Sequence, residues 1–566
     1  MPTIGIDLGT TNSLCAYWSE DGPVIIPNIL GSNLTPSIIS IDENDEILIG
    51  QVAKERLITH PHLTVSCFKR YMGTDKQYCI GKYVFTPIDL SAFVLKALKA
   101  DAEAYFNEEV KEAVISVPAY FNDKQRKATK QAAELAGFHV ERLISEPTAA
   151  AIAYGLHQEK DETKFMIFDL GGGTFDVSIL ELFDGIMEVR AIAGDNYLGG
   201  EDFTNLLVDY FVRNEHINME MLDSKEMSAL YKQAEMCKRL LGEKNIGNMT
   251  FTYRGLTLTR EISRPEYEKL VTPLLLRLRQ PIERSMRDAD LRPSDLDAVI
   301  LIGGATRMQI IKSVVGKMFG KLPYSNINPD EAVALGAAIQ VALKERNESL
   351  EEIILTDVCP YTLGTAVVKE ISDGKYEPGY FLPIIERNTP IPVSRMERLS
   401  AIKDGQTEIN LMIYQGENRK VDGNIYLGVL PVKIAPAKSG EEAIEVRYTY
   451  DINGILEVEA IALKTGEKKS LVIEQNAGSM TKEEIEQRLI ALQDIKIHPR
   501  DKTENILLLA KGERLYEEAL GDRREYIGEL LHYFENILDK QNDLEIRKAA
   551  KAVREKLEVL EGWFDY

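Results

Sequence analysis

The sequence predicts a multidomain protein: an α/β domain, then a β domain, then a helical tail. Three observations predict this order. Strand-like and helix-like segments alternate over residues 1–350, period-two apolar patterns follow over residues 358–478, and a segment rich in Leu, Glu, Lys and Arg occupies residues 479–566. The chain has 566 residues. A single core usually stops growing at roughly 250–300 residues, so two or three domains are expected.

The α/β domain is indicated by short apolar runs that alternate with helical patterns. Residues 113–117 and 165–168 are typical of buried strands, whereas residues 124–136 and 144–155 have the pattern of helices. Residues 351–357 are short, partly apolar and lie between two unlike regions, so we interpret them as an interdomain linker. The alternative is the frayed end of the preceding helix.

An internal repeat divides the α/β domain into two similar halves. Residues 5–11 (GIDLGTT) resemble residues 167–174 (IFDLGGGT), because each has an apolar strand, one Asp and a Gly/Thr turn. A second strand follows each turn, at residues 13–18 and 175–180. We expect two similar lobes that face each other.

A third glycine-rich segment, residues 302–307 (IGGATR), joins these two. Backbone N–H groups approach a triphosphate only where side chains are small, so glycine turns after strands suit a phosphate cradle. One such loop alone would be better interpreted as a tight hairpin turn, but the agreement of three favours an ATP site. The sequence contains no G-x-x-x-x-G-K-[ST] motif, which excludes the P-loop architecture.

The residues of these loops divide by charge. A carboxylate repels phosphate but can hold Mg²⁺ directly or through metal-bound water, so Asp7 and Asp169 are predicted on the metal side. The predicted phosphate-side groups are Thr10, Thr11, Gly171, Gly172, Gly173 and Thr174.

Bulk composition narrows the function further. The formal net charge of −22 argues against a nucleic-acid partner, because phosphate binding needs a basic face. Five scattered cysteines without a C-x-x-C pair favour reduced thiols over disulfides or a zinc site. The sequence shows no secretory signal, and no apolar run approaches the ~20 residues that cross a bilayer. We expect a cytoplasmic protein without a membrane partner.

Several longer segments resemble the DnaK-type heat-shock protein 70 family. They are residues 5–13, 117–122, 146–155, 168–177, 199–203 and 328–338, and more weakly 358–363, 387–392 and 453–456. The resemblance covers essentially the whole chain, becomes vague after residue 480 and is most specific to the short bacterial HscC-type paralogue. It implies an actin/hexokinase-like two-lobed ATPase domain (1–350), a linker (351–357), a β-sandwich peptide-binding domain (358–478) and a short helical lid (479–566).

The resemblance also implies the site residues. It places the phosphate, Mg²⁺ and hydrolysis positions at Asp7, Thr10, Thr11, Lys69, Glu146, Asp169, Thr174 and Asp176, and the adenosine pocket at Glu235, Lys238, Arg239, Gly304, Arg307 and Asp330. Mg²⁺ is the implied ion, with K⁺ as a further candidate. Gly242 stands where the family usually has Ser, and Ala305 where it has Ser or Gln. We therefore expect fewer hydrogen bonds to the adenosine.

Two of these residues have a plainer interpretation when taken alone. Lys69 would be a surface cation, but in register with the family it is the candidate that orients the attacking water and offsets charge on the γ-phosphate. Glu146 would be a favourable charge at a helix start, and by resemblance it accepts a hydrogen bond from a metal-bound water.

Four further positions match the family's coupling machinery. Pro118 and Arg126 correspond to a pair that relays the nucleotide state outward, although Pro118 alone is also explained as the end of a strand. Arg142 and Asp357 correspond to positions involved with J-domain partners and the linker. Glu141 stands where a Lys often precedes that Arg, so a different partner choice is expected.

By resemblance the β domain holds extended apolar peptides, for which backbone hydrogen bonds supply affinity and an apolar pocket supplies preference. The matching cleft positions are Val367, Val368, Leu399, Ile402, Ile409, Leu411 and Ile444. Without the family these residues would be interpreted as ordinary sandwich core. Leu399 stands where an aromatic residue is common and Thr365 where Ile is common, which predicts an altered peptide preference.

The implied function is that of an ATPase and molecular chaperone, which binds and releases extended hydrophobic segments of unfolded proteins together with a J-domain co-chaperone. The need for a nucleotide exchange factor stays open, because residues 243–258, where such factors commonly bind, are shorter than in DnaK. The short helical tail predicts fast peptide release.

The sequence leaves three rival functions open. A small-molecule kinase of the same two-lobed superfamily would need a carboxylate base and a sugar pocket, and would not need the β domain. An actin-like filament protein would leave residues 358–566 without a role. A nucleotide-gated scaffold without hydrolysis is disfavoured by the intact Lys69, Asp169 and Thr174.

Overall fold

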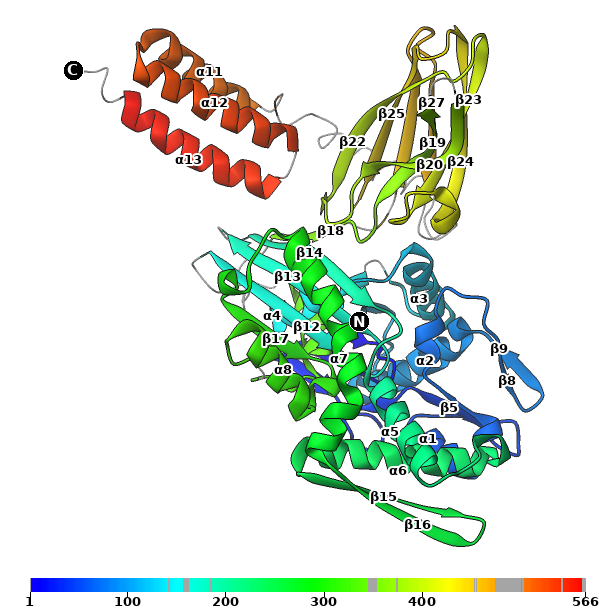
Figure 1. The fold of residues 1–566 in the computed structure, drawn as a ribbon. Coiled ribbons are helices and arrows are strands. Elements are labelled where there is room, and N and C mark those ends of the chain that lie inside the picture. Colours follow the sequence, from blue (N-terminus) through cyan, green and yellow to red (C-terminus); the bar gives the residue numbers. More distant parts are fainter. Residues whose placement is uncertain are drawn as a thin grey trace. The chain divides into compact units, whose positions relative to one another are not determined.

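The computed structural model describes residues 2–140, 143–155, 162–183, 186–324, 326–344, 354–372, 375–451, 454, 456–473, 500, 503–540 and 543–561. The chain divides into two compact units, Met1–Thr356 and Asp357–Tyr566. Figure 1 shows sheets and helices in the first unit, and strands followed by helices in the second. The predicted α/β part followed by a β-rich part is therefore confirmed.

The first lobe of the first unit is built on a mixed sheet in the order β11-β10-β1-β2-β3, with β4 paired to β2. Its strands are β1 (Thr3–Asp7), β2 (Asn12–Ser19), β3 (Gly22–Ile26), β4 (Thr35–Pro36), β10 (Glu112–Val117) and β11 (Leu143–Ser145). β1 pairs in parallel with β10 and antiparallel with β2. The helices of this lobe include α2 (Pro87–Phe106), α3 (Asp123–Leu135), α4 (Glu146–Ala153) and α9 (Ala332–Lys344).

The second lobe repeats this arrangement. Its sheet runs in the order β17-β12-β13-β14-β18. The strands are β12 (Thr163–Leu170), β13 (Phe175–Phe183), β14 (Ile186–Asp195), β17 (Ala298–Ile302) and β18 (Ile354–Val358). β12 pairs in parallel with β17 and antiparallel with β13, as β1 does with β10 and β2. Each lobe has its own hydrophobic core. The two repeated segments of the sequence thus occupy equivalent places in two similar sheets.

Strand residues occur in the segment expected to be a helix, 144–155, and in the expected linker, 351–357. The helix expected over residues 144–155 begins only at Glu146, because Ile144 and Ser145 belong to β11 beside β10. Pro147 in the first turn fits that later start, since proline is tolerated where the backbone N–H has no helical partner. In the expected linker, Ile354–Val358 is strand β18, and residues 354–356 pair in parallel with β14. Residues 351–353 lie outside the described part.

The remaining elements of the second lobe are mainly helical. They are α5 (Gly200–Asn214), α6 (Ser224–Glu243), β15 (Ile246–Tyr253), β16 (Leu256–Ser263), α7 (Arg264–Asp288) and α8 (Gln309–Phe319). Side chains that hydrogen-bond backbone N–H groups cap α6 and α7 at their N-termini, Asp223 for α6 and Ser263 for α7. In Figure 1 the hairpin β15–β16 extends along one end of the first unit.

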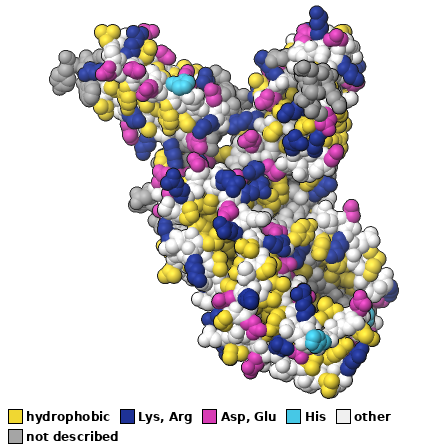
Figure 2. Space-filling view, in the orientation of Figure 1, with side chains coloured by type: hydrophobic (Ala, Val, Ile, Leu, Met, Phe, Trp, Pro, Cys, Tyr) yellow, Lys and Arg dark blue, Asp and Glu magenta, His cyan; other side chains and the backbone are white. Residues whose placement is uncertain are grey.

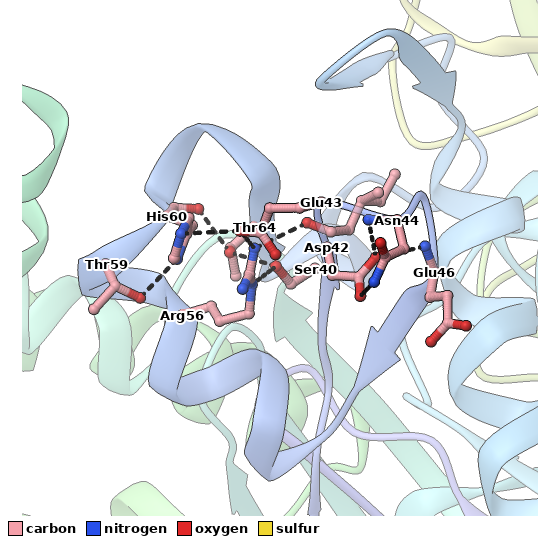
Figure 3. A network of polar contacts seen from close by, with 10 residues as sticks. Ser40, Asp42, Glu43, Asn44, Glu46, Arg56, Thr59, His60 and Thr64 are labelled. Carbon is pink, nitrogen blue, oxygen red and sulfur yellow. Dashed lines mark hydrogen bonds and ion pairs between the residues drawn. The ribbon is translucent and has the colours of Figure 1, made fainter.

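A small three-stranded sheet of the first lobe is tied to its helix by one arginine. The strands are β5 (Ile38–Ile41), β6 (Ile47–Ile49) and β7 (Thr64–Ser66), and the helix is α1 (Gln51–Thr59). Arg56 donates from Nε to the Ser40 hydroxyl at 2.9 Å and pairs with Glu43 at 3.3 Å, and His60 lies 3.2 Å from the same carboxylate (Figure 3). Arg56 therefore links α1 to β5.

Helices α4 and α9 cross so closely that only glycine fits at the crossing. A Cβ on Gly336 of α9 would lie 1.7 Å from the carbonyl oxygen of Ala149 on α4. A Cβ on Gly5 of β1 would lie 2.4 Å from the backbone nitrogen of Ala338. Because the obstructing atoms are backbone, a side-chain rotation cannot relieve either clash.

We expect Gly336→Ala to lower the free energy of unfolding of the first unit by about 3 kcal/mol or more, since overpacking against backbone separates two helices. Gly242 is the matched control: it also lies in a helix, α6, and its Cβ would meet nothing within 4 Å. Gly242→Ala should instead stabilise by about 0.5–1 kcal/mol through helix propensity. Chemical denaturation of the full chain measures both, and equal shifts would contradict the crossing argument.

The β-rich part of the second unit consists of two four-stranded antiparallel sheets, in the orders β20-β19-β23-β24 and β22-β25-β26-β27. The strands are β19 (Leu363–Ser372), β20 (Lys375–Ile385), β22 (Val393–Ser400), β23 (Gln406–Gln415), β24 (Ile425–Ala437), β25 (Glu442–Tyr450), β26 (Leu456–Ala462) and β27 (Lys468–Ile473). One core lies between them. The Tyr448 hydroxyl, fully buried there, donates to the Gly364 carbonyl at 3.2 Å and so joins the two sheets.

In the described residues after the strands, the structure has three helices: α11 (Thr503–Glu518), α12 (Asp522–Lys540) and α13 (Asp543–Glu561). They share a core of their own, which includes Leu515, Phe534 and Val553. The helix start predicted at Thr481 lies outside the described residues. Among the helices in the described part of the chain, none has both the length and the apolar composition that crossing a membrane requires. On the visible face of the molecule, basic and acidic side chains are interspersed (Figure 2).

Candidate functional site

The first glycine loop joins β1 to β2. Asp7, the last residue of β1, accepts a hydrogen bond from the Ser116 hydroxyl of β10 at 3.0 Å, which fixes its carboxylate at the edge of the sheet. Thr10 is buried. The Thr11 hydroxyl is buried too, without a hydrogen-bond partner among the described residues. An unpaired buried hydroxyl is costly, so a polar ligand for Thr11 is expected at this place.

The second glycine loop joins β12 to β13 and faces the first. The Gly171 N–H donates to the Thr174 carbonyl at 3.0 Å and closes the turn. A Cβ on Gly172 would lie 1.8 Å from the Thr11 hydroxyl oxygen, and one on Gly173 would lie 2.6 Å from the Thr10 methyl carbon. The two loops therefore meet across the lobes, and glycines are required where they meet.

The third glycine loop follows β17 and reaches the same place. Gly303 has a φ of +81°, and a Cβ there would lie 2.6 Å from Asp169 Oδ1. A Cβ on Gly304 would likewise lie 2.6 Å from Asp330 Oδ1. The Arg307 guanidinium donates to Asp330 Oδ2 at 2.7 Å. The structure thus brings together the three loops that the sequence singled out.

Glu146, Asp169, Asp176 and Lys69 are buried beside these loops, and Asp7 is half-buried. Lys69 Nζ lies 3.0 Å from Glu146 Oε1, and the two side chains are only 4% and 9% exposed. Burial, with repulsion from Glu146, raises the pKa of Asp7 to about 7 and that of Asp176 to about 7. Burial, followed by repulsion from Glu146, Asp176 and Asp7, raises the pKa of Asp169 as well. One ammonium cannot balance four carboxylates.

This excess of buried negative charge fits a divalent cation. Carboxylate oxygens are the ligands that Mg²⁺ uses in proteins, and Mg²⁺ usually keeps several water ligands and adds substrate phosphates. In the described parts of the chain, no three acidic, His or Cys side chains are close enough to hold an ion by themselves. The residues therefore fit an ion held partly through water, with Asp7, Asp169 and Glu146 around it.

The residues expected in the adenosine pocket lie on α6 and around the third loop. Lys238 Nζ pairs with Glu235 at 2.6 Å and donates to the Gly200 carbonyl at 2.9 Å. A Cβ on Gly200 would lie 3.3 Å from the Ala305 Cβ and 3.5 Å from Lys238 Nζ, so these three elements meet at Gly200. Arg239 is bonded to Glu235 at 2.8 Å but is largely exposed.

Comparison with known proteins decides the family. A family profile described as Hsp70 protein matches residues 3–79 and 76–563. The chain belongs to the Hsp70 family. The chaperone proteins DnaK of Thermotoga neapolitana and Thermotoga maritima are each 44% identical over 485 residues, which are 83% of this chain and 80% of each relative. That of Thermosipho africanus is 43% identical over 484 residues, 83% of this chain and 79% of the relative.

The segment between Pro118 and Arg126, the two residues that the family resemblance assigns to coupling, contacts Asp176. Pro118 is buried directly after β10. The Tyr120 N–H, two residues later, donates to Asp176 Oδ1 at 3.2 Å. Arg126 on α3 donates to the carbonyls of Phe121 at 3.2 Å and Ala119 at 3.4 Å. The segment after Pro118 is therefore held by Asp176 on one side and Arg126 on the other.

Of the two residues that the resemblance assigns to J-domain partners and the linker, Asp357 is the one in the described part of the chain. Arg142 lies outside the described residues. Asp357 is the first residue of the second unit and lies near the end of β18. It pairs with Ile391 of β21 (Pro390–Ile391) and accepts the N–H of Val358 at 2.8 Å. 

The seven expected peptide-binding residues divide by burial. Ile444 and Leu411 are 0% and 1% exposed and belong to the sandwich core. Leu399 lies opposite Ile444 on the neighbouring strand and, like Ile409, is half-buried against that core. Val367 and Val368 on β19 are half-buried. Ile402, just after β22, is 43% exposed.

Two residues of the site, Ser116 and Arg70, were missed from the sequence. Ser116, which holds Asp7, looks like any small residue of a buried strand. Arg70 donates from Nε to the Gly173 carbonyl at 2.7 Å and pairs with Asp202. Arg70 directly follows Lys69, and that adjacency was the signal that could have found it.

Proposed function

We propose that this Hsp70-family chain is an ATP-dependent molecular chaperone, an ATPase whose nucleotide state governs binding and release of extended hydrophobic segments of unfolded proteins. The observation that carries the proposal is the meeting of three glycine loops around buried carboxylates and the Lys69 ammonium. The relatives that are 44% identical are named chaperone protein DnaK.

In this proposal the glycine loops hold the phosphates of ATP through backbone N–H groups. The unpaired Thr11 hydroxyl donates to a phosphate oxygen, and Thr10 and Thr174 lie in the same loops. When bound, Mg²⁺ would neutralise charge on the β- and γ-phosphates. Asp7, Asp169 and, through water, Glu146 would hold it, which relieves their mutual repulsion. K⁺ remains a further candidate without an assigned residue.

Hydrolysis is assigned to Lys69. Its ammonium is buried and fixed at 3.0 Å from Glu146, so it needs no reorganisation as charge develops on the γ-phosphate. Phosphoryl transfer to water depends on positioning and charge neutralisation more than on a strong base. Lys69 would orient the attacking water and offset that charge. Glu235, Lys238 and Arg239 would hold the adenosine from one side, and Gly304, Arg307 and Asp330 from the other.

Coupling to partners is also part of the proposal. The path from Asp176 through the segment after Pro118 to Arg126 would report the nucleotide state at the surface. A J-domain co-chaperone would act on the ATPase through Arg142 and Asp357. The short HscC-type paralogue is the proposed subtype, and the cytoplasm the proposed compartment.

The β-rich part would hold the client. Extended peptides can combine backbone hydrogen bonds with an apolar pocket. Ile402, the most exposed of the seven expected residues, is the one most accessible to a peptide, whereas Leu411 and Ile444 would support the pocket from the core. The helices α11–α13 would act as a short lid, from which we expect fast peptide release.

The proposal is tested by single-turnover ATP hydrolysis with and without an apolar, extended peptide. Peptide should speed hydrolysis, because binding coupled to two conformations must be reciprocal. Ile402→Asp should remove this stimulation by introducing a charge where apolar peptide binds. Val84→Asp is the matched control, since Val84 on β9 (Tyr83–Phe85) is a similarly exposed apolar strand residue of the first unit.

Two outcomes would contradict the proposal in different ways. Absence of ATP binding in the wild-type chain would contradict the nucleotide site. A small-molecule kinase would be favoured by two results together: peptide leaves the rate of ATP hydrolysis unchanged, and the protein transfers phosphate from ATP to a sugar hydroxyl.

A further inference from the structure

Arg70 joins the two lobes beside the nucleotide cleft. It lies on the 3₁₀ helix η2 (Phe68–Tyr71), which also carries Lys69. Its guanidinium donates from Nε to the Gly173 carbonyl at 2.7 Å and from Nη2 to Asp202 Oδ2 at 2.5 Å. The two charged side chains are 13% and 22% exposed, so water screens this pair less than a surface pair.

η2 belongs to the first lobe. Phe68 and Met72, on either side of Lys69 and Arg70, are buried in the first lobe's core. Both groups that Arg70 binds belong to the second lobe, because Gly173 joins β12 to β13 and Asp202 lies on α5. Separating the lobes therefore requires breaking both hydrogen bonds of one side chain.

Asp202 has a second role that makes it a firm anchor. The same carboxylate oxygen accepts the Gly199 N–H at 2.8 Å and so caps α5. The first turn of α5 is bonded to the second glycine loop, because the N–H groups of Gly200 and Glu201 donate to the carbonyls of Gly171 and Gly172, each at 2.9 Å. Asp202, the start of α5 and the glycine loop thus form one hydrogen-bonded unit.

We propose that Arg70 is a positioning residue and a latch: it holds Lys69 in register with the second glycine loop, and its release limits how fast nucleotide leaves. The inference rests on the proposed ATP site and extends it to the regulation of that site. Because Arg70 and Lys69 are neighbours on one short helix, a lobe movement that breaks the Arg70 bonds also withdraws the Lys69 ammonium from the phosphate loop. Slow nucleotide release and fast hydrolysis then depend on the same contact.

The test uses three variants of the full chain: Arg70→Ala, Asp202→Asn and the two combined. Asn keeps an oxygen that can cap α5 but removes the charge that Arg70 binds. We expect release of a fluorescent ADP analogue to be about tenfold faster in each, and no faster in the combined variant, since both changes remove one interaction. Single-turnover hydrolysis should slow in parallel. Arg70→Lys should restore part of the slow release, because lysine keeps the ion pair but cannot also reach Gly173.

Arg277→Ala is the matched control. Arg277 on α7 pairs with Asp195 at 2.6 Å, an ion pair of the same type that lies within the second lobe. ADP release from this variant should match the wild type. A second readout needs no nucleotide: hydrogen exchange at the amides of Thr10 and Gly173 in nucleotide-free protein should be faster in Arg70→Ala and unchanged in Arg277→Ala.

The outcomes separate this inference from the proposed function. If wild-type protein binds no ATP, the proposed function fails, and the exchange experiment still decides the latch. If ADP is bound but the Arg70 and Asp202 variants release it at the wild-type rate, the latch is wrong. The latch is also wrong if their effects multiply in the combined variant, or if Arg277→Ala changes release equally.

Discussion

Lys69→Met is expected to slow single-turnover ATP hydrolysis about 100- to 1,000-fold, the usual cost of removing one preorganised charge from a transition state. ATP should still bind, because the glycine loops hold the phosphates through backbone groups and not through this side chain. The Lys69 side chain is 4% exposed and its ammonium is held 3.0 Å from Glu146 Oε1, so the charge is fixed in place. Single-turnover kinetics, with ATP affinity measured separately, distinguishes lost chemistry from lost binding.

Removing Lys69 alone also leaves Glu146 buried without its partner, which can cost about 3–5 kcal/mol of stability. The combined Lys69→Met/Glu146→Gln variant avoids this, because it removes both charges and nearly keeps both shapes. It should regain the wild-type unfolding midpoint and remain inactive. Lys82→Met is the control, since Lys82 is 65% exposed and pairs with Asp45 at the surface. Normal hydrolysis by Lys69→Met would overturn the assignment.

The glycine loops could be predicted because each carries its own local evidence. An apolar strand that ends in Asp7 or Asp169 and turns through glycines is visible in the sequence, and its repetition predicts two equivalent places. In the structure each of these strands, β1 and β12, lies between one parallel and one antiparallel neighbour in its sheet. Periodicity and turn chemistry are local properties, so they can be recognised in the sequence without knowledge of the tertiary structure.

Contacts between distant residues had no such evidence. Lys69 and Glu146 are 77 residues apart, and neither has a local pattern that requires a partner. The resemblance pointed to both, but their ion pair is known only from the fold. The same holds for Arg70, whose partners Gly173 and Asp202 lie 103 and 132 residues further along the chain.

The β-rich part shows a different limit. Alternation along β23 correctly groups Ile409 with Leu411 on one face, but it does not say whether that face meets the second sheet. Leu411 is 1% exposed and lies in the core, whereas Ile402, beyond the end of its strand, is exposed. A similar ambiguity explains why the helix expected from residue 144 begins at Glu146. Ile144 and Ser145 are compatible with a helix and with a strand, and in the structure they pair with β10.

Gly172→Ala is expected to weaken ATP binding about 10- to 100-fold, which corresponds to about 1–3 kcal/mol of overpacking. The new methyl would lie 1.8 Å from the Thr11 hydroxyl oxygen and 3.1 Å from the Thr11 Cβ. Rotation of Thr11 would relieve the first contact by turning its hydroxyl away from the cleft, but not the second. Either the lobes separate slightly or Thr11 loses its orientation, and both outcomes reduce affinity.

Gly171→Ala in the same loop provides the comparison, because its methyl would lie 3.7 Å from the Thr174 carbonyl oxygen, an ordinary van der Waals distance. Its effect on affinity should be smaller, although the backbone entropy of the loop changes equally. Isothermal titration with ATP measures both variants. Equal losses would mean that the loop needs flexibility rather than a close approach. A large loss of ATP affinity in Gly172→Ala that Thr11→Ala partly restores would instead show that the two lobes touch at Gly172 and Thr11 when nucleotide is bound. Only a contact between these two residues lets one substitution compensate the other.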